Sequence, residues 1–177
     1  MKSKISSFRL LYLLLFLVLV STKLNAQISY NRDTIMLAAQ EIIEENTYCA
    51  LITIDSTGQP QVRTMNPFPS NNELTIWFGT SRYSRKVREI KNNPKVAVYY
   101  ADHRTAKGYV NISGIAEVID NKELLLKMKR DYWESIPNWQ DNFVLIKIVS
   151  KSVEVINYRH HLTNDPKTFK APLIILN

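Results

Sequence analysis

The feature that most constrains the fold is a series of short strand-like segments divided by turn residues. Each segment is rich in Val, Ile, Thr or aromatic residues and is bounded by Gly, Pro, Asn or Asp. Five turn residues, 56–60, divide the first two segments and predict a hairpin. The chain lacks the regular alternation of strands and helices that builds a parallel sheet, which argues against a doubly wound fold. The predicted strands are 48–55, 61–65, 73–79, 95–101, 109–119 and 142–156.

Three segments have the apolar spacing of short helices instead: 32–46, 84–92 and 121–133. In the first, Ile35, Ala39 and Ile42 recur on one face, and Asp33 favours the helix start. Gly114 interrupts the fifth strand and predicts a bulge there. Six strands with three helices predict a mainly β fold, a single antiparallel barrel with peripheral α-helices.

The N-terminus has the pattern of a secretory signal peptide. Lys2, Lys4 and Arg9 precede an unbroken apolar run of 11 residues, 10–20, which is too short to span a bilayer comfortably. Cleavage after Ala26 would leave one domain, 27–177, exported to the periplasm or secreted and without stable membrane insertion. An uncleaved N-terminal anchor is the alternative.

Charge and cysteine content limit the classes of partner. The whole chain carries +7 from 23 basic and 16 acidic residues. Residues 1–26 hold four basic and no acidic residues, so the mature chain has 19 against 16, or +3. That charge is too small to indicate a nucleic-acid-binding surface. Cys49 has no partner for a disulfide, and the Cys and His spacing indicates no metal site.

A strand followed by hydroxyl and basic residues predicts a binding site for a phosphate. The segment from Ser81 to Lys86 follows an apolar run and precedes a predicted helix. Free N–H groups at a helix start and the helix dipole favour an anion, and Lys and Arg add charge-assisted hydrogen bonds. An ordinary capped surface helix is the alternative interpretation.

An ordered set of motifs resembles a known family. The chain resembles the pyridoxamine 5′-phosphate oxidase-like, FMN-binding split-barrel family in its general-stress-protein branch, over roughly residues 35–158. The motifs are Ala-Leu-Ile-Thr-Ile-Asp-x-x-Gly-x-Pro at 50–60, Val-Arg-Thr-Met at 62–65, Trp-Phe-Gly-Thr at 77–80, Ser-Arg-Lys-Val at 84–87, Asn-Asn-Pro-Lys-Val-Ala-Val at 92–98 and Val-Asn-Ile-Ser-Gly-Ile-Ala-Glu-Val at 110–118.

The resemblance implies a six-stranded antiparallel split β-barrel that forms a homodimer, with one FMN in each of two interface clefts. It assigns eight residues to cofactor binding. Arg63 and Lys86 would bind the phosphate with help from Ser84 and Arg85, Thr80 and Ser81 would bind the phosphate or ribityl chain, and the backbone of Arg63, Thr64 and Met65 would follow the isoalloxazine edge. On a strand, Arg63 and Met65 share one face and Thr64 lies on the other.

The resemblance implies a flavin-dependent oxidoreductase that passes electrons between FMN and a small-molecule donor or acceptor, and the N-terminal pattern adds that it is exported. No residue is assigned as catalytic. The alternative is a non-catalytic flavin- or haem-binding or sensing module, with His103, His160 or His161 as haem ligands. Arg159 and His161 have the spacing of an Arg-x-His motif of vitamin B6 oxidases, but the Trp that precedes that motif is missing. A nucleic-acid-binding barrel is a third, weaker alternative.

Overall fold

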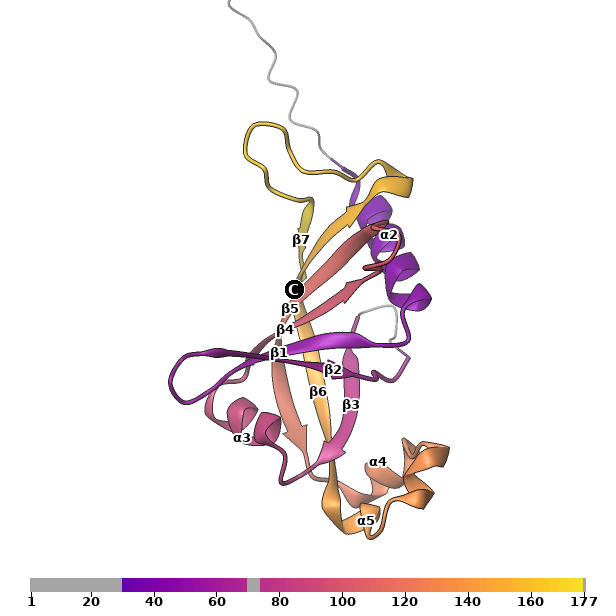
Figure 1. The fold of residues 1–177 in the computed structure, drawn as a ribbon, viewed down its shortest axis with the longest axis vertical. Coiled ribbons are helices and arrows are strands. Elements are labelled where there is room, and N and C mark those ends of the chain that lie inside the picture. Colours follow the sequence, from indigo (N-terminus) through magenta and orange to yellow (C-terminus); the bar gives the residue numbers. More distant parts are fainter. Residues whose placement is uncertain (1–29, 70–73, 177) are drawn as a thin grey trace, which may run out of the picture.

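The computed structural model describes residues 30–69 and 74–176, and these form a strongly curled antiparallel sheet with helices at its ends (Figure 1). The strand order is β2-β1-β4-β5-β6-β3, and β7 pairs with the far end of β6. Strands β2 and β3 therefore lie at the two ends of the order, which leaves the barrel split between them. The predicted mainly β, split-barrel fold is confirmed.

The strands match the predicted segments closely. The hairpin of β1 and β2 and the antiparallel pairing of β4, β5 and β6 are present, with a register shift at the predicted bulge between Ser113 and Gly114. The third strand lies further along the chain than 73–79, so that Thr80 and Ser81 belong to it. The strands are β1 (Cys49–Ile54), β2 (Pro60–Met65), β3 (Ile76–Ser81), β4 (Lys95–Ala101), β5 (Gly108–Ile119), β6 (Phe143–Asn157) and β7 (Leu173–Ile175).

The first two predicted helices are present as α2 (Arg32–Glu45) and α3 (Arg85–Asn92). The third predicted helix, 121–133, was too long. Its segment forms α4 (Lys122–Lys127), which ends at Met128, and a separate 3-10 turn, η1 (Asp131–Ser135). Trp133 lies in that turn because its ring is buried against the sheet, and tertiary packing overrides the local helical pattern. A short helix, α5 (Trp139–Asn142), follows.

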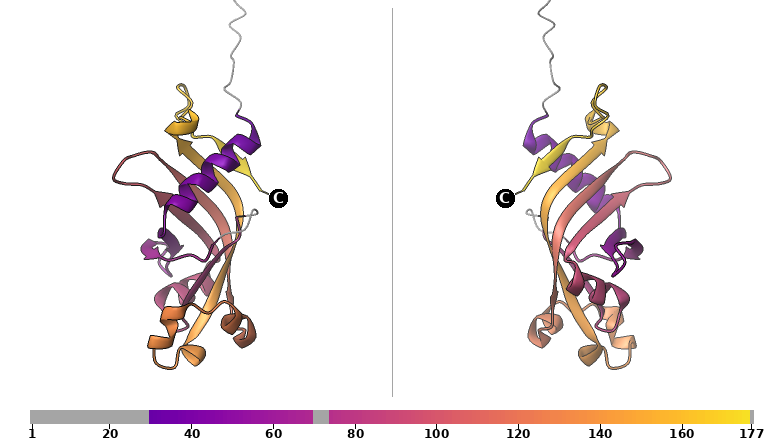
Figure 2. Two further views of the ribbon diagram at one scale, coloured as in Figure 1. Left: turned by 90° about the vertical axis from the view of Figure 1, so that its right-hand side faces the viewer. Right: turned by 90° about the vertical axis from the view of Figure 1, so that its left-hand side faces the viewer.

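The core fills the inside of the curled sheet. Side chains alternate between the two faces of each strand, and the inner ones, such as Leu51, Val98 and Ile112, are fully buried. Helix α2 lies across the ends of β5 and β6 with Ile35, Ala38, Ala39 and Ile42 against the core (Figure 2). Helix α3 packs against β1 and β5, and its Ile90 belongs to the same core cluster.

A second apolar cluster lies where residues 122–142 cover the outer face of β3 and β6. We call this segment the cap. Trp133 and Trp139 are buried in it with ring centroids 5.4 Å apart. Gly79 of β3 makes room for the cap, since a Cβ atom at that position would lie 2.1 Å from Cζ2 of Trp133. The cap holds β3, and with it the start of α3, against the long strand β6.

The C-terminal segment returns to the body of the same chain. After the 3-10 turn η2 (Tyr158–His160), β7 pairs with β6 through residues 152–154. Within the described residues, no helix is both long and apolar enough to cross a membrane. The predicted signal peptide at 1–26 and its cleavage site lie outside the described residues.

A candidate phosphate-binding site at the split of the barrel

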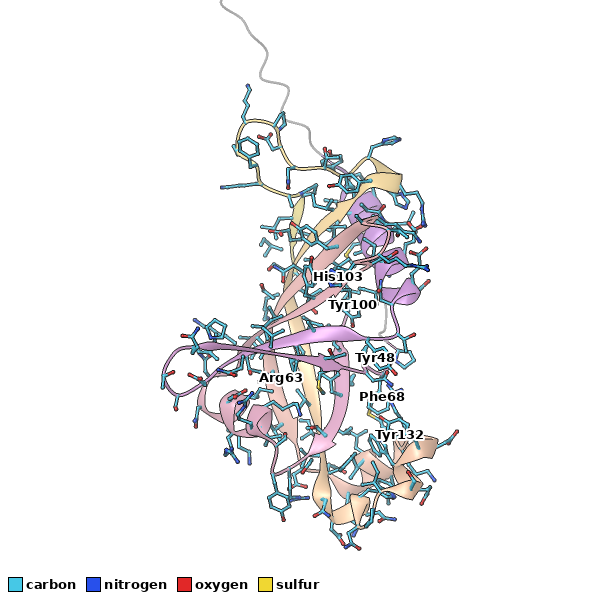
Figure 3. The ribbon with its side chains drawn as sticks, in the orientation of Figure 1. Tyr48, Arg63, Phe68, Tyr100, His103 and Tyr132 are labelled. Carbon is cyan, nitrogen blue, oxygen red and sulfur yellow. The ribbon has the colours of Figure 1, made fainter. Side chains whose placement is uncertain are left out.

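Two basic side chains and a hydroxyl, from three elements, meet where the barrel is split. Arg63 lies on β2, Thr80 on β3 and Lys86 in the first turn of α3. Arg63 is opposite Leu51 in the register, so its side chain faces the inside of the sheet, towards α3. Figure 3 shows Arg63 on the part of β2 that passes beside α3. Residues that are far apart in the sequence therefore form one group of charges.

The Arg63 guanidinium is held by two partners. Its Nη2 lies 2.7 Å from Oε2 of Glu89, a carboxylate of α3 that is only 4% exposed, and its Nη1 donates to the hydroxyl of Thr53 on β1. That hydroxyl donates in turn to Oε2 of Glu89 at 2.5 Å. Among the described residues, this ring of contacts uses two of the five guanidinium N–H donors of Arg63.

Lys86 is the second cation of the site. Its Nζ donates to Oγ1 of Thr80 at 3.0 Å. Partial burial lowers the pKa of Lys86 from its ordinary value of 10.5, the charge of Arg63 lowers it further, and the Glu89 carboxylate opposes the shift. An ammonium that is partly desolvated beside a second cation gains most from an added anion. Lys86 therefore has the environment of an anion ligand.

The start of α3 completes the site. Ser84 occupies the N-cap position with extended backbone angles, but its side chain makes no capping bond. Its buried Oγ has no hydrogen-bond partner among the described residues. The N–H of Val87 donates to the carbonyl of Ser84 at 3.1 Å, but the first helical residues have no carbonyl one turn back, as at any helix start, and this end carries the positive end of the dipole. A free hydroxyl and free N–H groups suit the oxygens of a phosphate.

The turn before α3 is fixed from the other side. Arg82 forms a two-point contact with Asp120, with Nη1 and Nη2 at 2.8 and 3.0 Å from the carboxylate oxygens. Its backbone N–H donates to the carbonyl of Asn142 at 2.8 Å. Arg82 thus anchors the turn to the cap, and its contacts are with Asp120 and Asn142 and not with Arg63 or Lys86. It is a positioning residue for the helix start.

The other predicted residues are spread around this group. Arg85 is more exposed, and its Nε lies 3.3 Å from Oε1 of Glu89. The Oγ of Ser81 accepts from the N–H of Tyr83 at 3.3 Å, within the turn. As expected from the strand pattern, Thr64 lies on the opposite face of β2 from Arg63 and is exposed. Met65 packs against the core, so its side chain is used for packing.

Two residues of the site, Glu89 and Thr53, were missed by the sequence analysis. A signal for each was present. Glu89 lies three residues after Lys86 and four after Arg85, so the three side chains lie on adjoining faces of a helix. Thr53 is a polar residue at an inward position of β1, in alternation with Cys49 and Leu51, and a polar residue at a core position needs a partner. The pairing itself depends on how α3 packs on β1.

The histidines lie elsewhere. His160 contacts Glu41 of α2 at 2.5 Å, and Arg159 forms ion pairs with Glu41 and Glu45. His103 lies within a turn closed by Asp102, at the end of the molecule that carries α2 (Figure 3). Arg159 therefore contacts α2 and lies away from the Arg63 site of its own chain. The described residues contain no group of three or more His, Cys, Asp or Glu side chains that could hold a metal ion.

The residues present fit the phosphate of a flavin nucleotide. Arg63, Arg85 and Lys86 with Glu89 carry a net of two positive charges, which matches a phosphate monoester with nearly two negative charges. Arginine suits two-point contacts to phosphate, and lysine acts as a point charge. The hydroxyls of Thr80 and Ser84 add neutral hydrogen bonds. An uncharged or cationic ligand would leave this group unbalanced.

Comparison with known proteins agrees with the fold. General stress protein 26 of Bacillus subtilis is 27% identical over 135 residues, which cover 72% of this chain and 91% of that protein. Among solved structures, a protein of Clostridium acetobutylicum related to general stress protein 26 has a TM-score of 0.67 at 15% identity, over 82% of this chain and 97% of that one.

A further solved structure is a pyridoxamine 5′-phosphate oxidase-related, FMN-binding protein of Nostoc punctiforme. It has a TM-score of 0.54 at 16% identity and covers 85% of this chain and 98% of that one. At such low identity, these structures show a shared fold. The sequence model of the pyridoxamine 5′-phosphate oxidase family matches residues 35–167, which is most of the chain. The chain therefore belongs to the pyridoxamine 5′-phosphate oxidase family.

Proposed function

We propose that this protein binds FMN at the split of the barrel and acts as a flavin-dependent oxidoreductase on a small molecule. The observation that carries the proposal is the convergence of Arg63, Lys86 and Thr80 beside the start of α3. This group would bind the terminal phosphate of FMN through charge-assisted hydrogen bonds. The FMN-binding relative from Nostoc punctiforme supports the choice of cofactor.

The bound flavin would supply the redox chemistry, since flavins transfer hydride or single electrons. The residues of the chain would hold and orient it. Arg63 and Lys86 would fix the phosphate, and the exposed edge of β2 at 63–65 would run beside the ring. The chain contributes no assigned proton donor or acceptor, so we expect the reaction to depend on positioning and on exclusion of water.

We also propose that two copies associate through the outer face of the sheet. This face has a shallow groove of about 420 Å³, and its apolar lining includes Ile52, Ile54, Ala97 and Ile115. Val62 is 64% exposed on the neighbouring strand β2. An apolar sheet face of this kind is more often covered by a partner than left in water.

Export through residues 1–26 remains part of the proposal, and FMN would then be acquired after export.

The test is a visible absorption spectrum of the purified chain 27–177 after incubation with FMN and removal of free ligand. We expect a flavin spectrum that dithionite bleaches and that a small acceptor restores, with FMN identified by mass after denaturation. A flavin spectrum that no acceptor restores would favour a binding or sensing role. A Soret band from co-purified haem, with no retention of added FMN, would contradict the flavin proposal.

A further inference from the structure

Glu89 is an unusual residue for a site that binds an anion. Its carboxylate is buried on the inward face of α3 and contacts two of the cations proposed to bind the phosphate. Its Oε2 takes the bonds from Arg63 and Thr53, and its Oε1 lies 3.3 Å from Arg85. A negative charge in this place repels a phosphate, so its presence calls for a separate explanation.

Without a ligand, the cations of the site lack the negative charge of a phosphate, and Glu89 supplies a negative charge there. Arg63 is 17% exposed and lies close enough to the half-buried Lys86 for their charges to interact unfavourably. Two partly buried like charges without a counter-ion destabilise a fold. Glu89 also fixes the plane of the guanidinium, because Thr53 and Glu89 together take one N–H from each Nη atom.

We propose that Glu89 is an internal counter-ion and positioning residue of the phosphate site. In the ligand-free protein its carboxylate holds Arg63 in place and balances part of the charge that a phosphate neutralises on binding. The chain thereby folds stably without ligand and binds the phosphate less tightly than its cations alone would allow. This inference rests on the proposed flavin site and adds to it a residue that sets affinity.

The experiment is a double-mutant cycle of Arg63→Gln and Glu89→Gln. The exposed Glu44 of α2 supplies the matched control, Glu44→Gln. For each variant, the melting temperature without ligand and the dissociation constants for inorganic phosphate and FMN are measured. Glutamine keeps the shape of Glu89 and can still accept from Arg63, so that Glu89→Gln removes the charge with little change in geometry.

We expect Glu89→Gln to melt at a lower temperature than the wild type and to bind both ligands roughly tenfold more tightly. The control should change neither value. Unchanged or weaker binding by Glu89→Gln, with binding by the wild type intact, would overturn the proposal. If Glu89→Gln alone does not fold, the double variant decides: Arg63→Gln/Glu89→Gln must melt at a higher temperature than Arg63→Gln, in which the buried carboxylate has lost the nearer of its two cations.

The two proposals fail in different ways. If the wild type binds neither FMN nor phosphate, the flavin function is wrong, whatever the melting temperatures show. If the wild type binds FMN and the Arg63→Gln/Glu89→Gln protein gains no stability over Arg63→Gln, the flavin function stands and the counter-ion role of Glu89 is wrong.

Discussion

At the scale of single residues, the proposed phosphate site depends on the ammonium group of Lys86. Its hydrogen bond goes to a neutral hydroxyl, Oγ1 of Thr80, although Arg63 and Glu89 lie near enough to influence its charge. We therefore predict that Lys86→Ala weakens FMN binding by about 1.5–3 kcal/mol, the range for a hydrogen bond to a charged group. Isothermal titration measures this, and Lys91→Ala on the exposed side of the same helix is the control. An equal loss in both variants would indicate only general charge attraction.

The lowered pKa of Lys86 leads to a pH prediction. Because burial and Arg63 favour the neutral amine, Lys86 loses its proton at a pH below 10.5, and the neutral form attracts a phosphate less. FMN affinity should fall as the pH rises through the alkaline range towards 10. Lys86→Arg keeps its charge there and should show a smaller fall. Parallel pH profiles for the two proteins would contradict the assignment.

Single residues also show what the sequence could predict. The family resemblance assigned Arg63, Thr80 and Lys86, and the local pattern of a strand leading into a helix indicated the segment that ends with Lys86. Glu89 and Thr53 were not recognised as partners, because their contact forms only when α3 packs against β1. The spacing on α3 and the polar inward position on β1 were visible in the sequence, but they do not show which side chains pair in the folded state.

At the scale of elements, the cap determines where β3 lies. Trp133 rests on Gly79, so a side chain at that position must displace a buried ring. We predict that Gly79→Ala lowers the free energy of unfolding by about 1–3 kcal/mol, as overpacking does. Urea denaturation followed by tryptophan fluorescence measures the change. Gly58→Ala has no atom within 4 Å of the new methyl group, and its cost comes from a φ of +85° alone.

The two glycine variants should differ in the fluorescence of the folded state. Gly79→Ala should change the emission of the buried Trp133 and Trp139, whereas Gly58→Ala should not. Identical emission in both variants would show that the ring is not seated on Gly79.

The strands, with their alternating apolar residues, could be predicted from the sequence. The break between α4 and η1 could not, because burial of Trp133 against β3 decides it.

At the scale of the whole molecule, the proposed dimer uses the outer face of the sheet. Ile115 is 40% exposed beside the groove, and Leu126 is 48% exposed on the cap. We predict that Ile115→Glu converts a dimer into a monomer, because two like charges would be buried at the interface. Leu126→Glu, a change of the same kind on the cap, should leave the dimer intact. Analytical ultracentrifugation separates these outcomes, and a monomeric wild type would contradict the proposed assembly.

The measurement that tests the central claim most directly is the affinity of the protein for FMN compared with riboflavin, which has the same ring and no phosphate. Since Arg63 and Lys86 each offer a charged hydrogen bond, we predict that FMN binds at least about a hundredfold more tightly. The preference should nearly disappear in Arg63→Gln/Lys86→Ala. Equal affinity of the wild-type protein for FMN and riboflavin would contradict the account.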